Sequence, residues 1–251
     1  MRQITPEVLE IAEDVFTARG THVNYLILRE GADITLIDAG WPRDVDGVER
    51  ALGALGHRPE DVRAILLTHA HIDHAGGTAA FHDRHGTPVL AHPREVGHAR
   101  GERRESAGPL DVVVRTYKPQ TMRWAIDIMR AGALTHAALP YAEAFPVADQ
   151  PVPLDLPGRP VPVLVTGHTS GHTAFHLPDT GVVATGDALV TGHPLSGKKT
   201  PQLLPEFFAT DPAEATRTLD ALAALDADVL APGHGAPLII DIARAVEIAR
   251  A

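Results

Sequence analysis

The chain has no cysteine among its 251 residues. This absence excludes disulfide bonds, zinc sites built from thiolates and cysteine nucleophiles. Aromatic residues are also scarce, at 4% of the sequence, so we expect a core of Ala, Val, Leu and Ile. Positive charge is in the minority, because 22 Lys and Arg stand against 32 Asp and Glu. An acidic protein repels phosphate backbones, and we therefore expect no nucleic acid partner.

The sequence also lacks a long apolar run. No stretch is long enough to span a bilayer, so we expect no membrane anchor. The first residues, MRQITPEVLEIAEDVF, contain no apolar run followed by a cleavage site, and they do not have the pattern of a secretory signal. These two observations favour a cytoplasmic protein.

Short strand-like runs alternate with helix-like segments along most of the chain. Residues 62–92 predict a strand, a loop, a helix closed by Gly86 and a second strand. Near the C-terminus, Asp211 followed by Pro212 marks the start of another helix. This alternation predicts an α/β fold, and the lack of linkers or repeats predicts a single domain over residues 1–251.

Residues 93–150 differ from the rest of the chain. They open with the charged stretch REVGHARGERRE and continue with apolar residues at helical spacing, namely Met122, Ala125, Ile126, Met129 and Ala133. An ordinary pair of surface helices explains this pattern. An inserted helical segment that acts as a lid, or as the interface of a homodimer, explains it equally well, because methionine-rich surfaces adapt to ligands and partners.

Histidine is abundant, with 15 residues in the chain, and the most informative of them form a cluster. His69, His71, Asp73 and His74 stand within six residues, directly after the apolar run Ile65–Leu67. In an extended loop, residues i and i+2 point the same way, so His69 and His71 can hold one metal ion together. Asp73 and His74 begin the following turn and face the position of a second, adjacent metal ion. Imidazole and carboxylate ligands suit zinc, manganese and iron.

Three later loops repeat this arrangement. In each, an apolar strand stops at a glycine and a residue able to bind a metal follows; these residues are His168, Asp187 and His234. Four strand ends are thereby expected to meet at one edge of a sheet. Together they supply five histidines and two aspartates, which is enough for two metal ions with one shared carboxylate.

These motifs resemble those of the metallo-β-lactamase-fold hydrolases. The matching segments are LIDAG with Asp38, the run THAHIDHAGG, TGHTSGH, TGDAL and PGHG. They follow the order of the family and cover nearly the whole chain except residues 93–150. The resemblance implies a four-layer αβ/βα sandwich, in which two sheets pack face to face and helices lie outside.

The resemblance also implies two zinc ions per chain, with manganese or iron as possible replacements. The first metal would be bound by His69, His71 and His168. The second metal would be bound by Asp73, His74 and His234. Asp187 would bridge the two metals. Asp38 and His172 would support the ligands from behind.

Two such ions lower the pKa of a shared water from about 15.7 toward 7. We expect the bridging hydroxide to attack a carbonyl carbon, with Asp73 or Asp187 orienting it or passing a proton. Within the family, the chain looks most like the glyoxalase II, thioesterase and lactonase group, which implies a small-molecule ester, thioester or lactone as substrate. An iron-dependent sulfur dioxygenase, a β-lactam hydrolase and a binding module without activity are the alternatives.

Four further residues are candidates for contact with the substrate. His193 comes shortly after Asp187 and is expected to line the pocket, while Lys198 in the same loop has a charge suited to an anionic group. Tyr117 and Tyr141 lie in the inserted segment. They are candidates for the tyrosine that lactonases of the family place near the carbonyl.

Overall fold

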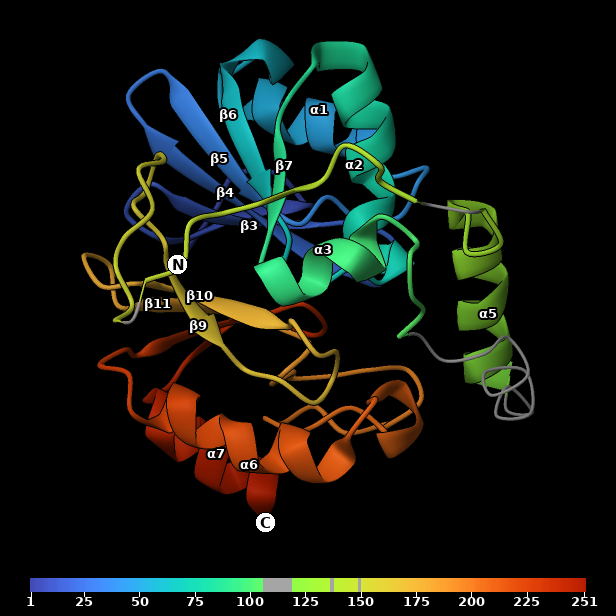
Figure 1. The fold of residues 1–251 in the computed structure, drawn as a ribbon, viewed down its shortest axis with the longest axis vertical. Coiled ribbons are helices and arrows are strands. Elements are labelled where there is room, and N and C mark those ends of the chain that lie inside the picture. The colour runs from blue at the N-terminus through green and yellow to red at the C-terminus, as the bar shows by residue number, and fades with distance from the viewer. Residues whose placement is uncertain (106–118, 136–137, 149) are drawn as a thin grey trace.

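The computed structural model describes residues 1–105, 119–135, 138–148 and 150–251. Two β-sheets lie face to face (Figure 1). The first sheet has, in spatial order, β1 (Arg2–Gln3), β2 (Val8–Ala12), β3 (Val15–Arg19), β4 (Asn24–Glu30), β5 (Asp33–Ile37), β6 (Val62–Leu66), β7 (Val89–Ala91) and β8 (Glu143–Ala144). The second has β13 (Leu238–Ile239), β12 (Val229–Pro232), β11 (Val182–Gly186), β10 (Thr173–Leu177) and β9 (Val161–Leu164).

Both sheets are mixed. In the first sheet, the four successive pairs from β1 to β5 are antiparallel. The three pairs from β5 to β8 are parallel. In the second sheet, β11 and β12 form the parallel pair and the other pairs are antiparallel. The parallel strands end in the same direction, which brings the loops after them to one edge.

Helices cover the outer face of each sheet. α1 (Val45–Ala54) and α2 (Ile72–His85) pack on the first sheet, and α6 (Pro212–Ala223) and α7 (Ile242–Arg250) pack on the second (Figure 1). A separate apolar layer lies between the sheets and includes Leu66 from β6 and Phe175 from β10. The four-layer αβ/βα sandwich is confirmed.

Local chemistry explains how these elements begin and end. β6 is buried on both faces, as expected for a strand covered on both sides. Ile65 packs between the first sheet and its helices, and Leu66 packs between the two sheets. α2 ends at Gly86, whose φ of 69° is left-handed and whose amide donates to the carbonyl of His82. α6 begins after Asp211, whose side chain accepts a hydrogen bond from the amide of Glu214.

The segment 93–150 contains helices but is not wholly helical. It includes α3 (Pro93–Ala99), α5 (Pro119–Ala131) and strand β8, and Phe145 beside β8 is buried between the two sheets. Part of this segment therefore belongs to the core of the fold. Two short 3-10 helices, η1 (Pro59–Asp61) and η2 (Glu206–Phe208), complete the described elements.

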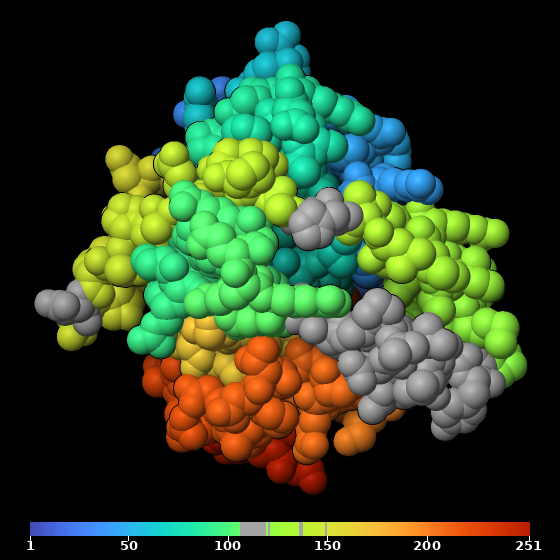
Figure 2. All heavy atoms as spheres, turned by 45° about the vertical axis from the view of Figure 1, so that its right-hand side comes forward, coloured from blue at the N-terminus to red at the C-terminus, as the bar shows by residue number. Residues whose placement is uncertain are grey.

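Helix α5 lies at the edge of the molecule (Figure 2). One face packs Trp124 and Ile128 against Val23 and Trp41. Its other face leaves three apolar side chains at helical spacing exposed, namely Met122, Ile126 and Met129. A lid or a homodimer interface at this face stays a prediction. Among the described residues, no helix combines the length and apolar character needed to cross a membrane.

Candidate metal centre

The histidines and aspartates singled out in the sequence meet where the loops of the two sheets face each other. The loop after β6 and the first turn of α2 supply His69, His71, Asp73 and His74. The second sheet supplies His168 after β9, Asp187 after β11 and His234 after β12. All seven side chains fall into two groups, and the possible ligand atoms of each group lie within 4.8 Å of one another.

Three imidazoles form the first group with one carboxylate. Nε2 of His168 lies 2.9 Å from Nδ1 of His71 and 3.2 Å from Nε2 of His69. The Oδ2 atom of Asp187 lies 3.4 Å from the same nitrogen of His168. All four side chains are buried. Three ring nitrogens and one oxygen thus point at a common space.

The second group stands on the other side of Asp187. Nε2 of His234 lies 3.3 Å from Oδ2 of Asp73, and Nε2 of His74 lies 3.9 Å from the same oxygen. The Oδ1 atom of Asp187 lies 3.2 Å from Nε2 of His74 and 3.4 Å from Nε2 of His234. Asp187 therefore turns one oxygen toward each group.

Hydrogen bonds on the outer side of the rings fix their tautomers. Nε2–H of His71 donates to the carbonyl of Glu105, and Nδ1–H of His234 donates to the carbonyl of His22, both at 2.7 Å. A neutral imidazole has only one N–H. In the neutral form of each ring, the nitrogen that faces the cluster is therefore the one with the lone pair, which is the state that a metal ligand needs.

Asp38 orients two rings at once. Its Oδ2 accepts hydrogen bonds from Nδ1 of His74 and from Oγ1 of Thr68, both at 2.8 Å, and its Oδ1 accepts from the amide of Thr68. Because the Thr68 hydroxyl gives its proton to Asp38, it accepts from Nδ1 of His69 at 3.0 Å. Asp38 also has a left-handed φ of 63°, a strained conformation that its contacts hold in place.

His172 lies behind the cluster and not in it. Its Nε2 accepts a hydrogen bond from the backbone amide of Asp187 at 3.0 Å. Burial lowers the pKa of His172 to about 4, so this ring is neutral at physiological pH. It therefore holds the backbone at the shared aspartate.

The two groups differ in charge. Burial lowers the pKa of His69 and of His168 well below the ordinary value, so these rings are neutral. In the second group burial also acts to lower the pKa of His234, but the carboxylates of Asp187 and Asp73 outweigh it and raise this pKa to about 10. The carboxylates of the second group thus favour positive charge at this position, which a bound cation would supply in place of the proton.

Two buried atoms without a hydrogen-bond partner indicate that the residues fit a metal. Nε2 of His74 and Oδ1 of Asp187 are buried and have no hydrogen-bond partner among the described residues. Buried polar atoms without a partner are rare and costly in a folded protein. A divalent cation between them supplies the missing interaction, so the donor set fits zinc, manganese or iron.

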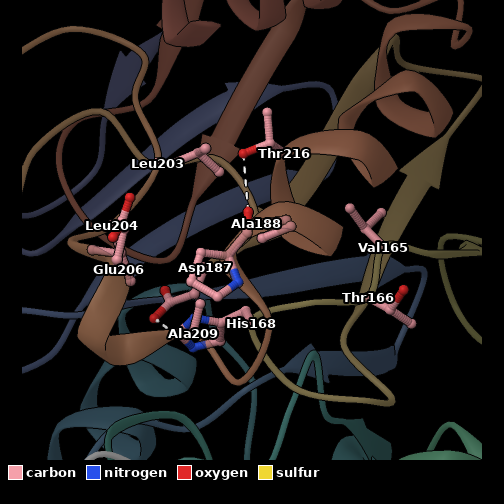
Figure 3. Close-up of a pocket in the computed structure, with 12 residues that line it drawn as sticks. Val165, Thr166, His168, Asp187, Ala188, Leu203, Leu204, Glu206, Ala209 and Thr216 are labelled. Carbon is pink, nitrogen blue, oxygen red and sulfur yellow. Dashed lines mark hydrogen bonds and ion pairs between the residues drawn. The ribbon is translucent and has the colours of Figure 1, made fainter.

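A cavity of about 200 Å³ opens beside the cluster. Figure 3 shows His168 and Asp187 projecting into it, with Leu203 and Val165 on either side. Most of its other lining is also apolar and comes from Ala188, Leu204, Ala209, Pro212 and Ala215. It has the size and character to take a short apolar group.

A second, wider cleft lies on the His234 side. His193 lines this cleft, and its ring centroid lies 5.2 Å from that of His234. Burial lowers the pKa of His193 to about 3. Its Nδ1 accepts a hydrogen bond from the amide of Leu195, so the ring proton is on Nε2. The cleft also has five basic side chains, from Arg19, Arg43, Arg130, Lys198 and Lys199.

The structure describes one of the two tyrosine candidates, Tyr141, and places it away from the cluster. Tyr117 lies outside the described residues. Tyr141 stacks on His82 with a centroid separation of 3.7 Å, in the second half of α2, whereas the cluster lies at the first turn of that helix. The structure gives Tyr141 a packing contact with α2.

Several residues that support the centre, among them Glu95, Glu105 and Thr68, were not singled out in the sequence. The charged stretch after residue 93 has the composition of a surface, but Glu95 within it is fully buried beside the ligand loops. The only signal available was its position just after the end of a buried strand, β7.

Known proteins are similar to this chain in sequence and in fold. The probable metallo-hydrolase YflN of Bacillus subtilis is 28% identical over 222 residues, which cover 83% of this chain and 78% of that protein. A hydroxyacylglutathione hydrolase of Ruegeria pomeroyi is 33% identical over 156 residues, which cover 61% of this chain and only 45% of that protein. Among solved structures, a metallo-beta-lactamase family protein from Thermus thermophilus has a TM-score of 0.62 at 24% identity, and the match covers 98% of this chain and 79% of that one. Residues 18–234 match the family model of the metallo-beta-lactamase superfamily. The chain belongs to this superfamily of metal-dependent hydrolases.

Proposed function

We propose that the protein is a dinuclear metal-dependent hydrolase that cleaves the ester, thioester or lactone bond of a small molecule. One observation carries the proposal: Asp187 places Oδ2 3.4 Å from His168 and Oδ1 3.2 Å from His74. A carboxylate that faces two complete groups of ligands is suited to bridge two cations. A site for a single metal ion would not require the second group of ligands, Asp73, His74 and His234.

The residues at the centre fit two zinc ions, since imidazole and carboxylate are the ligands that zinc takes in hydrolases without cysteine. His69, His71 and His168 would hold one ion, and Asp73, His74 and His234 the other. When bound, such a pair acts as a Lewis acid toward a carbonyl oxygen and makes a shared water acidic.

Asp73 is suited to the proton transfer. Its side chain is 18% exposed, whereas those of His74, His234 and Asp187 are almost fully buried. Burial raises the pKa of Asp73, but the charges of His74 and His234 lower it below the ordinary value. Asp73 is therefore ionised and partly exposed, and it can accept a hydrogen bond from a water and so orient it.

His193 is suited to contact the substrate. It is held between the rings of Trp124 and Phe208, each with a centroid 5.4 Å away. With Nδ1 occupied by the amide of Leu195, its Nε2–H is a fixed donor beside the second group. A donor in this position can bind a carbonyl or carboxylate oxygen and favours developing negative charge there.

The two openings support an acyl substrate. The apolar cavity at His168 and Asp187 suits an acyl chain, and the basic cleft that includes Lys198 suits an anionic leaving part. The Ruegeria pomeroyi relative is a hydroxyacylglutathione hydrolase by name, which supports the thioester class of bond. Glutathione itself is not carried over, because the match covers less than half of that relative.

A panel of substrates with protein of measured zinc content tests the proposal. It should contain p-nitrophenyl esters, acyl thioesters, lactones, a β-lactam and a thiol with dissolved oxygen. We expect turnover of at least one ester, thioester or lactone, and its loss in His71→Ala. A matched control is His176→Ala, because the ring of His176 in β10 bonds the carbonyl of Asp226 and belongs to neither group of ligands.

Three outcomes would contradict the proposal. Oxygen-dependent thiol oxidation with one iron would indicate a sulfur dioxygenase. Turnover of the β-lactam alone would indicate a β-lactamase. Full metal content with no turnover would indicate a binding protein.

A further inference from the structure

Glu95, in the first turn of α3, is fully buried and lies outside the seven-residue cluster. Its carboxylate accepts four hydrogen bonds. Oε1 accepts from the amide of Ala70 at 2.9 Å and from Nδ1 of His98 at 2.8 Å. Oε2 accepts from Oγ1 of Thr169 at 2.8 Å and from the amide of Gly171 at 3.1 Å. A carboxylate is tolerated away from water only where such donors replace it.

Three of these four donors come from the two ligand loops, and the fourth, His98, is in α3 itself. Ala70 stands between His69 and His71, in the loop after β6 of the first sheet. Thr169 directly follows His168, in the loop after β9 of the second sheet. The two oxygens of one carboxylate therefore tie together the loops that carry all three imidazoles of the first group.

Helix α3 lies at the junction of the two sheets, in direct contact with the second loop (Figure 1). A Cβ atom at Gly171 would lie only 2.4 Å from the backbone nitrogen of Glu95. The backbones of helix and loop therefore touch, and no other side chain can separate them. Because the packing is this close, a shift of the backbone at Glu95 would also displace the loop that contains Gly171 and His168.

Glu105 makes a second contact of the same kind. Its backbone carbonyl accepts the Nε2–H of His71 at 2.7 Å. Its carboxylate accepts from the amide of Ser170 at 2.6 Å and from the hydroxyl of Ser170 at 2.9 Å. Residues 95–105 thus contact the His71 loop and the His168 loop at two places each.

We infer that Glu95 is a positioning residue that fixes the spacing of the His69–His71 and His168 loops, and so sets the affinity of the first group for a divalent cation. The second group is supported elsewhere, because its hydrogen bonds run to Asp38 and to the carbonyl of His22. This inference rests on the metal-binding part of the proposed function and is independent of the substrate.

The charge at position 95 is essential to this role. A glutamine has the same volume, but its amide has one acceptor and one donor. Whichever way the amide is turned, its NH₂ faces a backbone N–H, that of Ala70 or that of Gly171. One of the two loops must then move away. Glu95→Gln is therefore a conservative variant that breaks one side of the link.

Cobalt titration of metal-free protein tests the inference without a substrate. We expect wild-type protein to bind two Co²⁺ and to show visible d–d absorption. In Glu95→Gln, the affinity for one Co²⁺ should fall about 10- to 100-fold in chelator competition, as is typical when a residue supporting a metal ligand is lost. The d–d spectrum of that ion should change. Glu143→Gln, an exposed glutamate of β8, is the control and should bind as wild type.

Combining Glu95→Gln with a second substitution that disables one group of ligands identifies which of the two ions is affected. In His234→Ala, which disables the second group, Glu95→Gln should weaken the remaining ion by the same factor. In His168→Ala, it should leave the remaining ion unchanged. Equal weakening in both backgrounds would overturn the inference, and so would unchanged binding in Glu95→Gln.

A milder variant covers the case in which Glu95→Gln does not fold. Thr169→Val removes one of the four hydrogen bonds and keeps the shape of the side chain. It should weaken the same ion by a smaller factor, and unchanged binding would overturn the inference. A protein that shows these effects but hydrolyses nothing would contradict the proposed function while leaving the role of Glu95 intact.

Discussion

The Oδ1 atom of Asp187 lies 3.2 Å from Nε2 of His74, and neither atom has a hydrogen-bond partner among the described residues. Both are buried, and His74 holds its other nitrogen against Asp38 at 2.8 Å. In its neutral form, a ring that gives its Nδ1 proton to one carboxylate turns the lone pair of Nε2 toward the second. The pair is thereby arranged to share a cation.

Asp187→Asn should break the bridge between the two groups. The amide keeps the volume of the side chain but has no negative charge and offers one acceptor atom instead of two. We expect at least one of two metal equivalents to be lost on dialysis, measured by elemental analysis, with loss of hydrolysis. Asp226→Asn, an exposed aspartate, should keep both. Full metal content in Asp187→Asn would contradict the bridging role.

Leu204→Trp should shorten the acyl groups that the enzyme accepts. Leu204 is partly exposed and lines the cavity that contains His168 and Asp187, so a larger ring fits the fold but fills the cavity. We expect kcat/KM for a long-chain acyl ester to fall by about 10-fold or more, since one methylene is worth roughly 10- to 200-fold in such pockets. An acetyl ester should be hydrolysed as before.

Leu134→Trp is the control for this variant, because Leu134 is 76% exposed. Equal losses for long and short esters in Leu204→Trp would show that the cavity does not hold the acyl group.

The sequence predicted most of the fold because the strands of this protein have clear patterns. The apolar run Ile65–Leu67 indicated β6, and Gly86 indicated the end of α2. The ligand residues were also visible, because each follows directly after a strand. The loops after β6, β11 and β12 follow strands of parallel pairs, and the sheet sets the place of their ligand residues, whereas His168 follows the antiparallel strand β9.

Other parts of the centre left no such pattern. Glu95 lies in a charged stretch, and only the packing of α3 against Gly171 shows that it is buried. The role of His22 depends on its backbone carbonyl, which any residue would supply. Tyr141 was a candidate for its chemistry alone, and its contact with His82 is a matter of tertiary packing. Contacts between distant segments decide these roles.

Gly77→Ala should destabilise the protein. A Cβ atom at Gly77 would lie 2.2 Å from the carbonyl oxygen of Ala39, so α2 must move away from the loop that carries Asp38. We expect a loss of about 1–3 kcal/mol in the free energy of unfolding, the usual cost of overpacking, measured by urea denaturation. Gly53→Ala in α1 meets no atom within 4 Å and should stabilise by about 0.5–1 kcal/mol. The reverse order would contradict the packing described.

The contribution of Glu95 to stability should depend on pH. Burial raises the pKa of Glu95, but the hydrogen bond and charge of His98 and the amide of Ala70 lower it below the ordinary value. A depressed pKa means that the unfolded chain binds the proton more readily. The stabilisation is therefore present above the pKa of an unfolded glutamate, about 4.3, and is lost as the pH falls through the folded value.

Urea denaturation of metal-free wild type and Glu95→Gln measures this effect. We expect the variant to be less stable by about 3 kcal/mol at neutral pH, as when one partner of a buried charged contact is lost. The gap should narrow below about pH 4. A gap that stays constant or widens on acidification would show that Glu95 is not ionised in the folded protein.

The metal content of the purified protein tests the central claim most directly. Protein loaded with zinc, freed of excess metal by gel filtration and analysed by mass spectrometry of the elements should contain two zinc ions per chain, and His234→Ala should contain one. A single ion in wild type, or two ions in His234→Ala, would contradict the division of these seven side chains into two metal sites that share Asp187.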